Sequence, residues 1–254
     1  MQYIFSGRSR PEGIRILFDV KNPPLKLKVE GIEGQTCELA LLLSGGFYLA
    51  VSVTTPTAIV DIATFRNQML TVCKSMYDAA TFLNGTAVGV ELTSLTEVET
   101  GRFWTFQDAV PELKQSAHER PIPTEELINL ALTNTYLRSA LSDLNEAITS
   151  PNDTGFYCYR AIETLMQEFK LPGEDSKATW PRFREALRVT QHWIKPLTDK
   201  SISNRHGELK TLSGNERVFL MSRSWMLVYR FARLRLLRTA SLPESDFPLL
   251  NASS

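Results

Sequence analysis

The chain has 254 residues, with 28 lysines and arginines against 28 aspartates and glutamates, and 43% of its residues are hydrophobic. A chain of this length can bury a core without disulfide or metal support, and its hydrophobic content excludes a wholly disordered protein. The balanced charge excludes a uniformly basic, polyanion-binding protein but leaves room for a local basic patch. We therefore expect one or two globular domains.

The cysteines and the apolar segments restrict the class of protein further. Cys37, Cys73 and Cys158 are far apart and form no C-x-x-C pair, which excludes a zinc ribbon and argues against a disulfide framework. The first residues lack the pattern of a signal peptide. The most apolar window, residues 40–53, is too short for a membrane span, which needs about 18–20 apolar residues. These features predict a cytoplasmic protein that does not enter a membrane.

The first part of the chain alternates apolar and polar residues with the period of β-strands. The predicted strands are residues 3–5, 14–20, 25–30, 38–43 and 47–53, with a last pair between 88 and 104. Gly45 and Gly46 favour a tight hairpin between the fourth and fifth strands. Residues 59–83 carry apolar side chains at helical spacing, and Asn84-Gly85 is a typical helix end. Residues 1–115 thus predict an α+β domain, a mixed or antiparallel sheet with one covering helix.

From Pro123 onward the apolar pattern is helical. The predicted helices are residues 124–148, 154–169, a third starting near 179, 194–203, and a last one that ends near 238. Asn134 lies within the leucine seam of the first, where a single polar residue can set the register of a helix pair. Ser213 and Glu216 form a capping-box pattern before the last. We expect an α-helical bundle of about five helices over residues 122–240 and a flexible tail over 241–254.

The common catalytic and nucleotide-binding motifs are absent from the sequence. It has no phosphate loop, no G-x-G-x-x-G turn, no H-E-x-x-H pair and no G-x-S-x-G elbow. Its histidines, His118, His192 and His206, are too scattered to suggest a metal site. We therefore expect neither a metal nor a cofactor.

Two segments of the helical part combine charged residues with a predicted core. Arg160 and Glu163 share one helix face beside apolar positions, either as an internal ion pair or as part of a site. Asn204, Arg205 and His206 stand at the predicted end of a later helix, where cations also suit the helix dipole. A buried polar network that locks helix ends accounts for these residues as well as a functional site does.

A helical bundle with an R-A-I-E helix (residues 160–163) and an N-R-H-G helix end (residues 204–207) resembles the HEPN superfamily, the higher eukaryote and prokaryote nucleotide-binding domains. The resemblance covers roughly residues 123–240. Many members are metal-independent ribonucleases of toxin–antitoxin, abortive-infection and CRISPR systems, whereas others act as binding or scaffold modules. The resemblance implies a protein that binds or cleaves RNA or a nucleotide, in phage defence or the stress response, and that forms a homodimer.

The catalytic motif of the family, Arg followed after four to six residues by His, is degenerate here. If His206 is the motif histidine, the arginine positions hold Ser201, Lys200 and Asp199. The resemblance then implies His206 as the acid or base and Lys200 or Arg205 as the cation that stabilises charge.

Within the same site, the resemblance implies that Asn204 orients the reacting groups, and that Arg160 and Glu163 bind substrate as part of the cleft lining. The alternative is a non-catalytic homodimeric scaffold in which the Arg/His cluster is structural.

The last helix carries an excess of arginines between Gly214 and Thr239. They are Arg217, Arg223, Arg230, Arg233, Arg235 and Arg238. Such a helix can follow phosphates along a nucleic acid, but the apolar residues between the arginines favour a largely buried helix. Its arginines would then pair with Glu163, Asp143, Glu146 or a partner chain.

Overall fold

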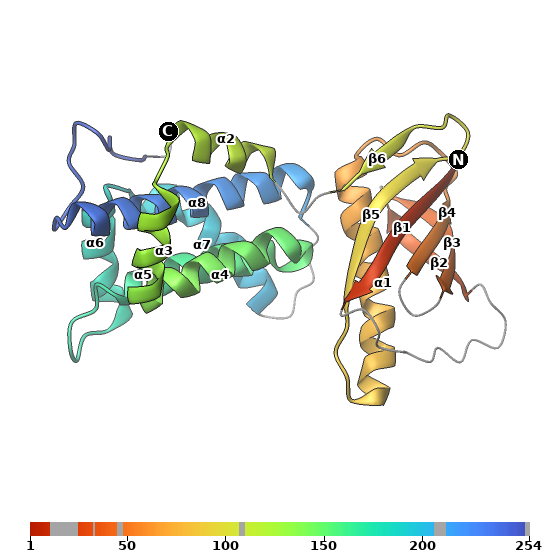
Figure 1. Cartoon of the computed structure of the whole chain (residues 1–254), viewed down its shortest axis with the longest axis horizontal. Helices are drawn as coiled ribbons and strands as arrows, with labels where there is room; N and C mark the ends of the chain where they lie inside the picture. The colour runs from red at the N-terminus through yellow and green to blue at the C-terminus, as the bar shows by residue number, and fades with distance from the viewer. Residues whose placement is uncertain (11–24, 33, 45–47, 107–109, 206–211, 252–254) are drawn as a thin grey trace. The chain divides into compact units, whose positions relative to one another are not determined.

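A computed structural model describes residues 1–10, 25–32, 34–44, 48–106, 110–205 and 212–251 of the chain (Figure 1). The chain divides into two compact units, Met1–Gln107 and Asp108–Ser254. The division lies before the junction expected from the sequence, and each unit has its own hydrophobic core. The α+β architecture is the one that the sequence predicts.

The first unit is a six-stranded antiparallel sheet with the strand order β2-β3-β4-β1-β5-β6. The strands are β1 (Gln2–Arg10), β2 (Leu25–Ile32), β3 (Gln35–Ser44), β4 (Tyr48–Thr54), β5 (Gly89–Glu97) and β6 (Phe103–Thr105). β3 and β4 pair antiparallel as the expected hairpin arms, and the residues of their turn lie outside the described ranges. The expected strand over residues 14–20 also lies outside them.

One helix, α1 (Ile62–Asn84), packs on the apolar face of the sheet (Figure 1). Tyr3 and Phe5 of β1 are buried there, and both rings meet Phe65 edge to face at 5.3 and 5.0 Å between centroids. Asp61 caps the start of α1, and Gly85 ends it with a positive φ of 60°. The predicted helix end is therefore confirmed, because glycine takes this left-handed conformation without steric cost.

The second unit is a helical bundle in which α4 and α5 pack against each other and against the long helix α8. Its helices are α2 (Pro111–Glu119), α3 (Thr124–Thr133), α4 (Thr135–Thr149), α5 (Thr154–Gln167), α6 (Ser176–Leu187), α7 (Gln191–Arg205) and α8 (Gly214–Leu237). A 3-10 turn, η1 (Pro151–Asp153), joins α4 to α5. Ser213 and Glu216 form the predicted capping box of α8. In the described residues no helix combines the length and the apolar character needed to cross a membrane.

Asn134 corrects the expectation of one continuous helix over residues 124–148. It has an extended backbone and separates α3 from α4, and its Oδ1 accepts a hydrogen bond from the backbone N of Leu137. Its Nδ2 donates to Glu168 over 2.7 Å. Asparagine favours the N-cap position because its side-chain oxygen replaces a missing backbone partner. Asn134 is therefore a helix cap, and not a polar position within a helix seam.

The C-terminal segment also differs from the expected flexible tail. Leu242 and Phe247 are buried against the bundle, and Leu250 pairs with Val189 in an isolated parallel bridge. Arg230 of α8 donates to the backbone O of Pro248 over 2.7 Å. Residues 241–251 thus pack against the bundle because their apolar side chains complete its core.

Candidate functional site

The residues that the resemblance assigns to catalysis lie at the C-terminal end of α7 and just beyond it. Asn204 and Arg205 belong to the last turn of α7, and the structure describes their backbone only. His206 lies outside the described residues. The assignment of these three residues to catalysis stays a prediction.

Lys200 is engaged in an ion pair that joins α7 to α8. Its Nζ donates to Oε1 of Glu216 over 2.6 Å, and the other carboxylate oxygen of Glu216 accepts from the backbone N of Ser213. These bonds hold the pKa of Glu216 below its usual value, chiefly through the bond from Lys200. Lys200 therefore lies against the capping box of α8, where it stabilises the start of that helix.

Arg160, one of the two predicted substrate-binding residues, pairs with Asp143 on the neighbouring helix α4. Its Nε donates to Oδ1 of Asp143 over 2.9 Å, and its Nη2 bonds to the same oxygen. The guanidinium carbon lies 5.1 Å from the ring centroid of Phe156 and 4.8 Å from that of Tyr157. Glu163, three residues further along α5, is half-buried. The structure thus pairs Arg160 with Asp143 and not with Glu163, the partner that the sequence suggested, and the role of Arg160 and Glu163 in substrate binding stays a prediction.

The arginines of α8 bind mainly to backbone carbonyls of other segments of the unit. Arg217 donates to Ala147 and Ile148, Arg223 to Trp193, and Arg230 to Leu187, Arg188 and Pro248. Arg235 pairs with Glu168 over 2.8 Å. Burial lowers the pKa of Arg230 to about 10. Because these arginines are engaged within the unit, the bonds favour internal interactions of this helix over a phosphate-tracking role.

A cavity of about 450 Å³ opens between α5, α6 and α7. The side chains that line it are Tyr159, Lys177, Trp180, Arg184, Gln191, Ile194, Lys195, Thr198 and Asp199. Lys177, Trp180 and Arg184 follow one another at spacings of three and four on α6, so they share one face of that helix. The volume falls within the range of pockets that hold small molecules, about 300–1,000 Å³.

The lining of this cavity carries more positive than negative charge. Lys195 pairs with Asp199, with 3.0 Å between Nζ and Oδ2. Lys177 and Arg184 form no ion pair within the part of the chain that the structure describes. Burial lowers the pKa of the Arg184 guanidinium from its ordinary value. A partly desolvated cation that forms no ion pair with a described residue is suited to binding an anionic ligand.

Trp180 supplies an aromatic surface beside these cations. Its ring is half-buried and stacks on Tyr159 at 6.3 Å and 23°. Phe183 supports it edge to face at 5.5 Å and 87°. Contacts with these two rings fix the position of the indole, which also lines the cavity.

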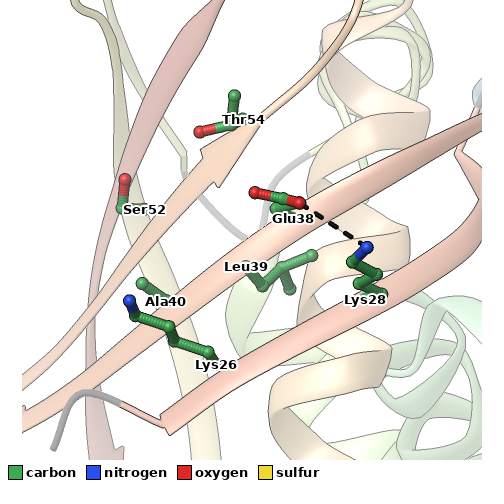
Figure 2. Close-up of a pocket in the computed structure, with 7 residues that line it drawn as sticks. All are labelled: Lys26, Lys28, Glu38, Leu39, Ala40, Ser52 and Thr54. Carbon is green, nitrogen blue, oxygen red and sulfur yellow. Dashed lines mark ion pairs between the residues drawn. The ribbon is translucent and has the colours of Figure 1, made fainter.

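A second, smaller hollow lies on the sheet of the first unit, and Figure 2 shows its lining. Its volume is about 330 Å³, and it lies over β2, β3 and β4 between Lys26, Lys28, Ala40 and Ser52. Lys28 pairs with Glu38 at 3.8 Å, and both side chains are about 70% exposed. An exposed pair of this kind interacts weakly, and the described residues of the lining include no aromatic side chain. The cavity of the helical unit is therefore the better candidate for a functional site.

The described residues do not suggest metal or thiol chemistry. They contain no cluster of three or more histidine, cysteine or acidic side chains that could hold a metal ion. The three cysteines are buried, and burial raises the pKa of both Cys73 and Cys158 to about 12. A thiol with such a pKa is protonated at neutral pH and does not act as a nucleophile.

Sequence reasoning missed this cavity, although part of its pattern was visible. The one-face spacing of Lys177, Trp180 and Arg184 was a usable signal. Its significance depends on α7, which provides the opposite wall, and the sequence did not show that α6 and α7 face one cavity.

Comparison with known families gives one match, to a C-terminal domain of unknown function (DUF8168), over residues 123–236. The match coincides with most of the helical unit and leaves the sheet unit uncovered. Neither the curated proteins nor the solved structures include a match to this chain.

Proposed function

We propose that the helical unit binds a nucleotide, free or as part of an RNA chain, in the cavity between α5, α6 and α7. The observation that carries the proposal is Arg184, a half-buried guanidinium that lines the cavity and forms no ion pair among the described residues. Burying a cation costs free energy unless an anion compensates it, and a phosphate group does so with bidentate hydrogen bonds.

The neighbouring side chains favour a nucleotide over a simple anion. Trp180 offers an indole on which a base can stack, and proteins that bind single-stranded nucleic acid use such stacking for each base they hold. Gln191 and Thr198 add hydrogen-bonding groups on the opposite wall. The resemblance of residues 123–240 to the HEPN superfamily supports the same ligand class. On the same resemblance, we propose a role in phage defence or the stress response.

The test is a titration of the full chain with fluorescently labelled nucleotides and with short single-stranded RNAs, read by anisotropy. We expect Arg184→Met to weaken binding about tenfold or more, since a charge-assisted hydrogen-bonded contact contributes about 1.5–3 kcal/mol. Arg120→Met is the matched control, because Arg120 is a partly exposed arginine of the same unit that pairs with Glu119. Equal affinities of the two variants, or no binding of any probe by the unaltered protein, would contradict the proposal.

Binding and cleavage are separated by a second measurement. RNA is incubated in EDTA with the unaltered protein and with His206→Ala, and the ends of any products are analysed. Cleavage that the variant loses, with 2′,3′-cyclic phosphate ends, would add metal-independent ribonuclease activity to the proposal. The ion pair of Lys200 with Glu216 favours binding alone, because it engages the one cation at the permitted motif positions.

A further inference from the structure

Asp199 on α7 is the only carboxylate among the described residues that line the cavity between α5, α6 and α7. Its Oδ2 accepts a hydrogen bond from Nζ of Lys195 over 3.0 Å, whereas its Oδ1 has no partner among the described residues. Both side chains are more than half exposed, and an exposed pair of this kind interacts weakly. Because a carboxylate accepts several hydrogen bonds, Asp199 can keep Lys195 and also bind a ligand that donates hydrogen bonds.

The polar groups of the cavity follow an order along its walls. Three residues connect α6 to α7, so Arg184, in the last turn of α6, lies near the junction of the two helices. Trp180 lies one turn before Arg184, and Lys177 lies about 10 Å before it along α6. Asp199 lies about 12 Å along α7 from the start of that helix. From the junction outward, the lining therefore presents a guanidinium, then an indole, and then an ammonium group with a carboxylate.

We infer that the cavity selects guanine nucleotides and that Asp199 and Lys177 determine the choice of base, an inference that rests on the proposed function. With the phosphate on Arg184 and the base on Trp180, the far edge of the base lies toward Lys177 and Asp199. Among the four bases of RNA, only guanine presents two adjacent donors, N1–H and the amino group at C2, and these match the two oxygens of a carboxylate. The neighbouring O6 of guanine accepts a hydrogen bond from the ammonium group of Lys177.

The other three bases match these two side chains less well. Adenine and cytosine present one amino group beside a ring nitrogen that accepts, and uracil presents one donor between two carbonyl oxygens. Each of them would therefore place an acceptor against an oxygen of Asp199, which is unfavourable because neither group donates a hydrogen bond. A bidentate contact that only one base can make suffices for a preference of about tenfold.

Binding of the four nucleoside 5′-monophosphates to the full chain, measured by isothermal titration calorimetry, tests the inference. We expect GMP to bind about tenfold more tightly than AMP, CMP or UMP. Lys177→Met should reduce the preference for GMP over AMP severalfold, because AMP has an amino group where GMP has O6. Lys170→Met is the matched control and should keep the preference, since Lys170 is exposed and lies outside the lining.

A change of ligand preference separates recognition of the base from a structural role of Asp199. Asp199→Asn replaces one acceptor oxygen with a donor, so it should weaken GMP binding about tenfold. The same variant should bind xanthosine 5′-monophosphate in preference to GMP, because the carbonyl group at C2 of xanthine accepts the new hydrogen bond. Asp246→Asn is the matched control, since Asp246 is an exposed aspartate of the same unit outside the lining.

The outcomes distinguish this inference from the proposed function. Equal binding of the four nucleotides, with a loss of affinity in Arg184→Met, would overturn guanine selection and leave nucleotide binding intact. An Asp199→Asn variant that still prefers GMP to xanthosine 5′-monophosphate would also overturn guanine selection. If the unaltered protein binds none of the nucleotides, the inference and the proposed function are both wrong.

Discussion

Arg160 on α5 donates from Nε to Oδ1 of Asp143 on α4 over 2.9 Å, and the two side chains differ strongly in exposure. The Asp143 side chain is 3% exposed and that of Arg160 is 43% exposed. The second oxygen of Asp143 is buried without a hydrogen-bond partner among the described residues. Leaving the Asp143 carboxylate without its partner therefore costs more free energy than leaving the Arg160 guanidinium without its partner.

This asymmetry predicts unequal effects of the two substitutions on stability. Arg160→Met leaves a buried, uncompensated carboxylate and should lower the free energy of unfolding by about 3–5 kcal/mol. Asp143→Asn leaves a guanidinium that water can reach and should cost about 1–3 kcal/mol. Urea denaturation of both variants measures the difference. Equal losses, or a larger loss for Asp143→Asn, would contradict this account of the pair.

The bond between Lys200 and Glu216 predicts a pH-dependent contribution to stability. The pKa of Glu216 in the folded protein lies below its usual value of 4.5. Its stabilising contribution is therefore fully present above pH 4.5 and is lost as the pH falls through the folded pKa. Glu216→Gln removes this dependence because the amide does not titrate.

The measurement is the difference in unfolding free energy between the unaltered protein and Glu216→Gln, at about pH 7 and at decreasing pH below 4.5. We expect the difference to shrink in the acid range. Lys200→Met should cost no more than about 1 kcal/mol, since both side chains are nearly half exposed. A difference that grows toward acid pH would contradict the assignment.

The buried cysteines predict slow thiol chemistry in the native state. Burial raises the pKa of Cys73 and Cys158 to about 12 and also raises that of Cys37. A disulfide reagent such as DTNB at about pH 8 should label the folded protein slowly and all three thiols rapidly in denaturant. Rapid stoichiometric labelling without denaturant would contradict their burial.

The packing of the C-terminal segment predicts a loss of stability on truncating Phe247. This side chain is 6% exposed and lies 6.3 Å from the ring of Tyr229, between centroids. Phe247→Ala should cost about 3 kcal/mol, the lower end for a buried phenylalanine, because a terminal segment can move into part of the cavity left behind. Leu249→Ala, at a 50% exposed position, should change stability by no more than about 0.5 kcal/mol.

Local patterns in the sequence sufficed for most individual elements. These patterns depend on residues that are close in sequence. Examples are the apolar alternation of β1, β3 and β4, the glycine that ends α1 and the capping box of α8. The local pattern at Asn134 was ambiguous. Asparagine suits both a helix cap and a polar seam position, and the bond to Glu168, 34 residues away, accompanies the cap.

The candidate site depends on contacts that local patterns do not contain. Arg184 and Trp180 line a cavity only because Tyr159 on α5 and residues of α7 form its other walls. Likewise, Arg160 was recognisable as a charge near a core, but its choice of Asp143 over Glu163 follows from the packing of α4 on α5. The sequence by itself determined most of the helices and strands and the caps at Gly85 and Ser213, because these depend on short-range spacing and backbone preference. It did not predict α2 or the break between α3 and α4 at Asn134. Only the tertiary structure decided which cations are paired and which face a cavity, because desolvation and pairing depend on neighbours that are distant in the chain.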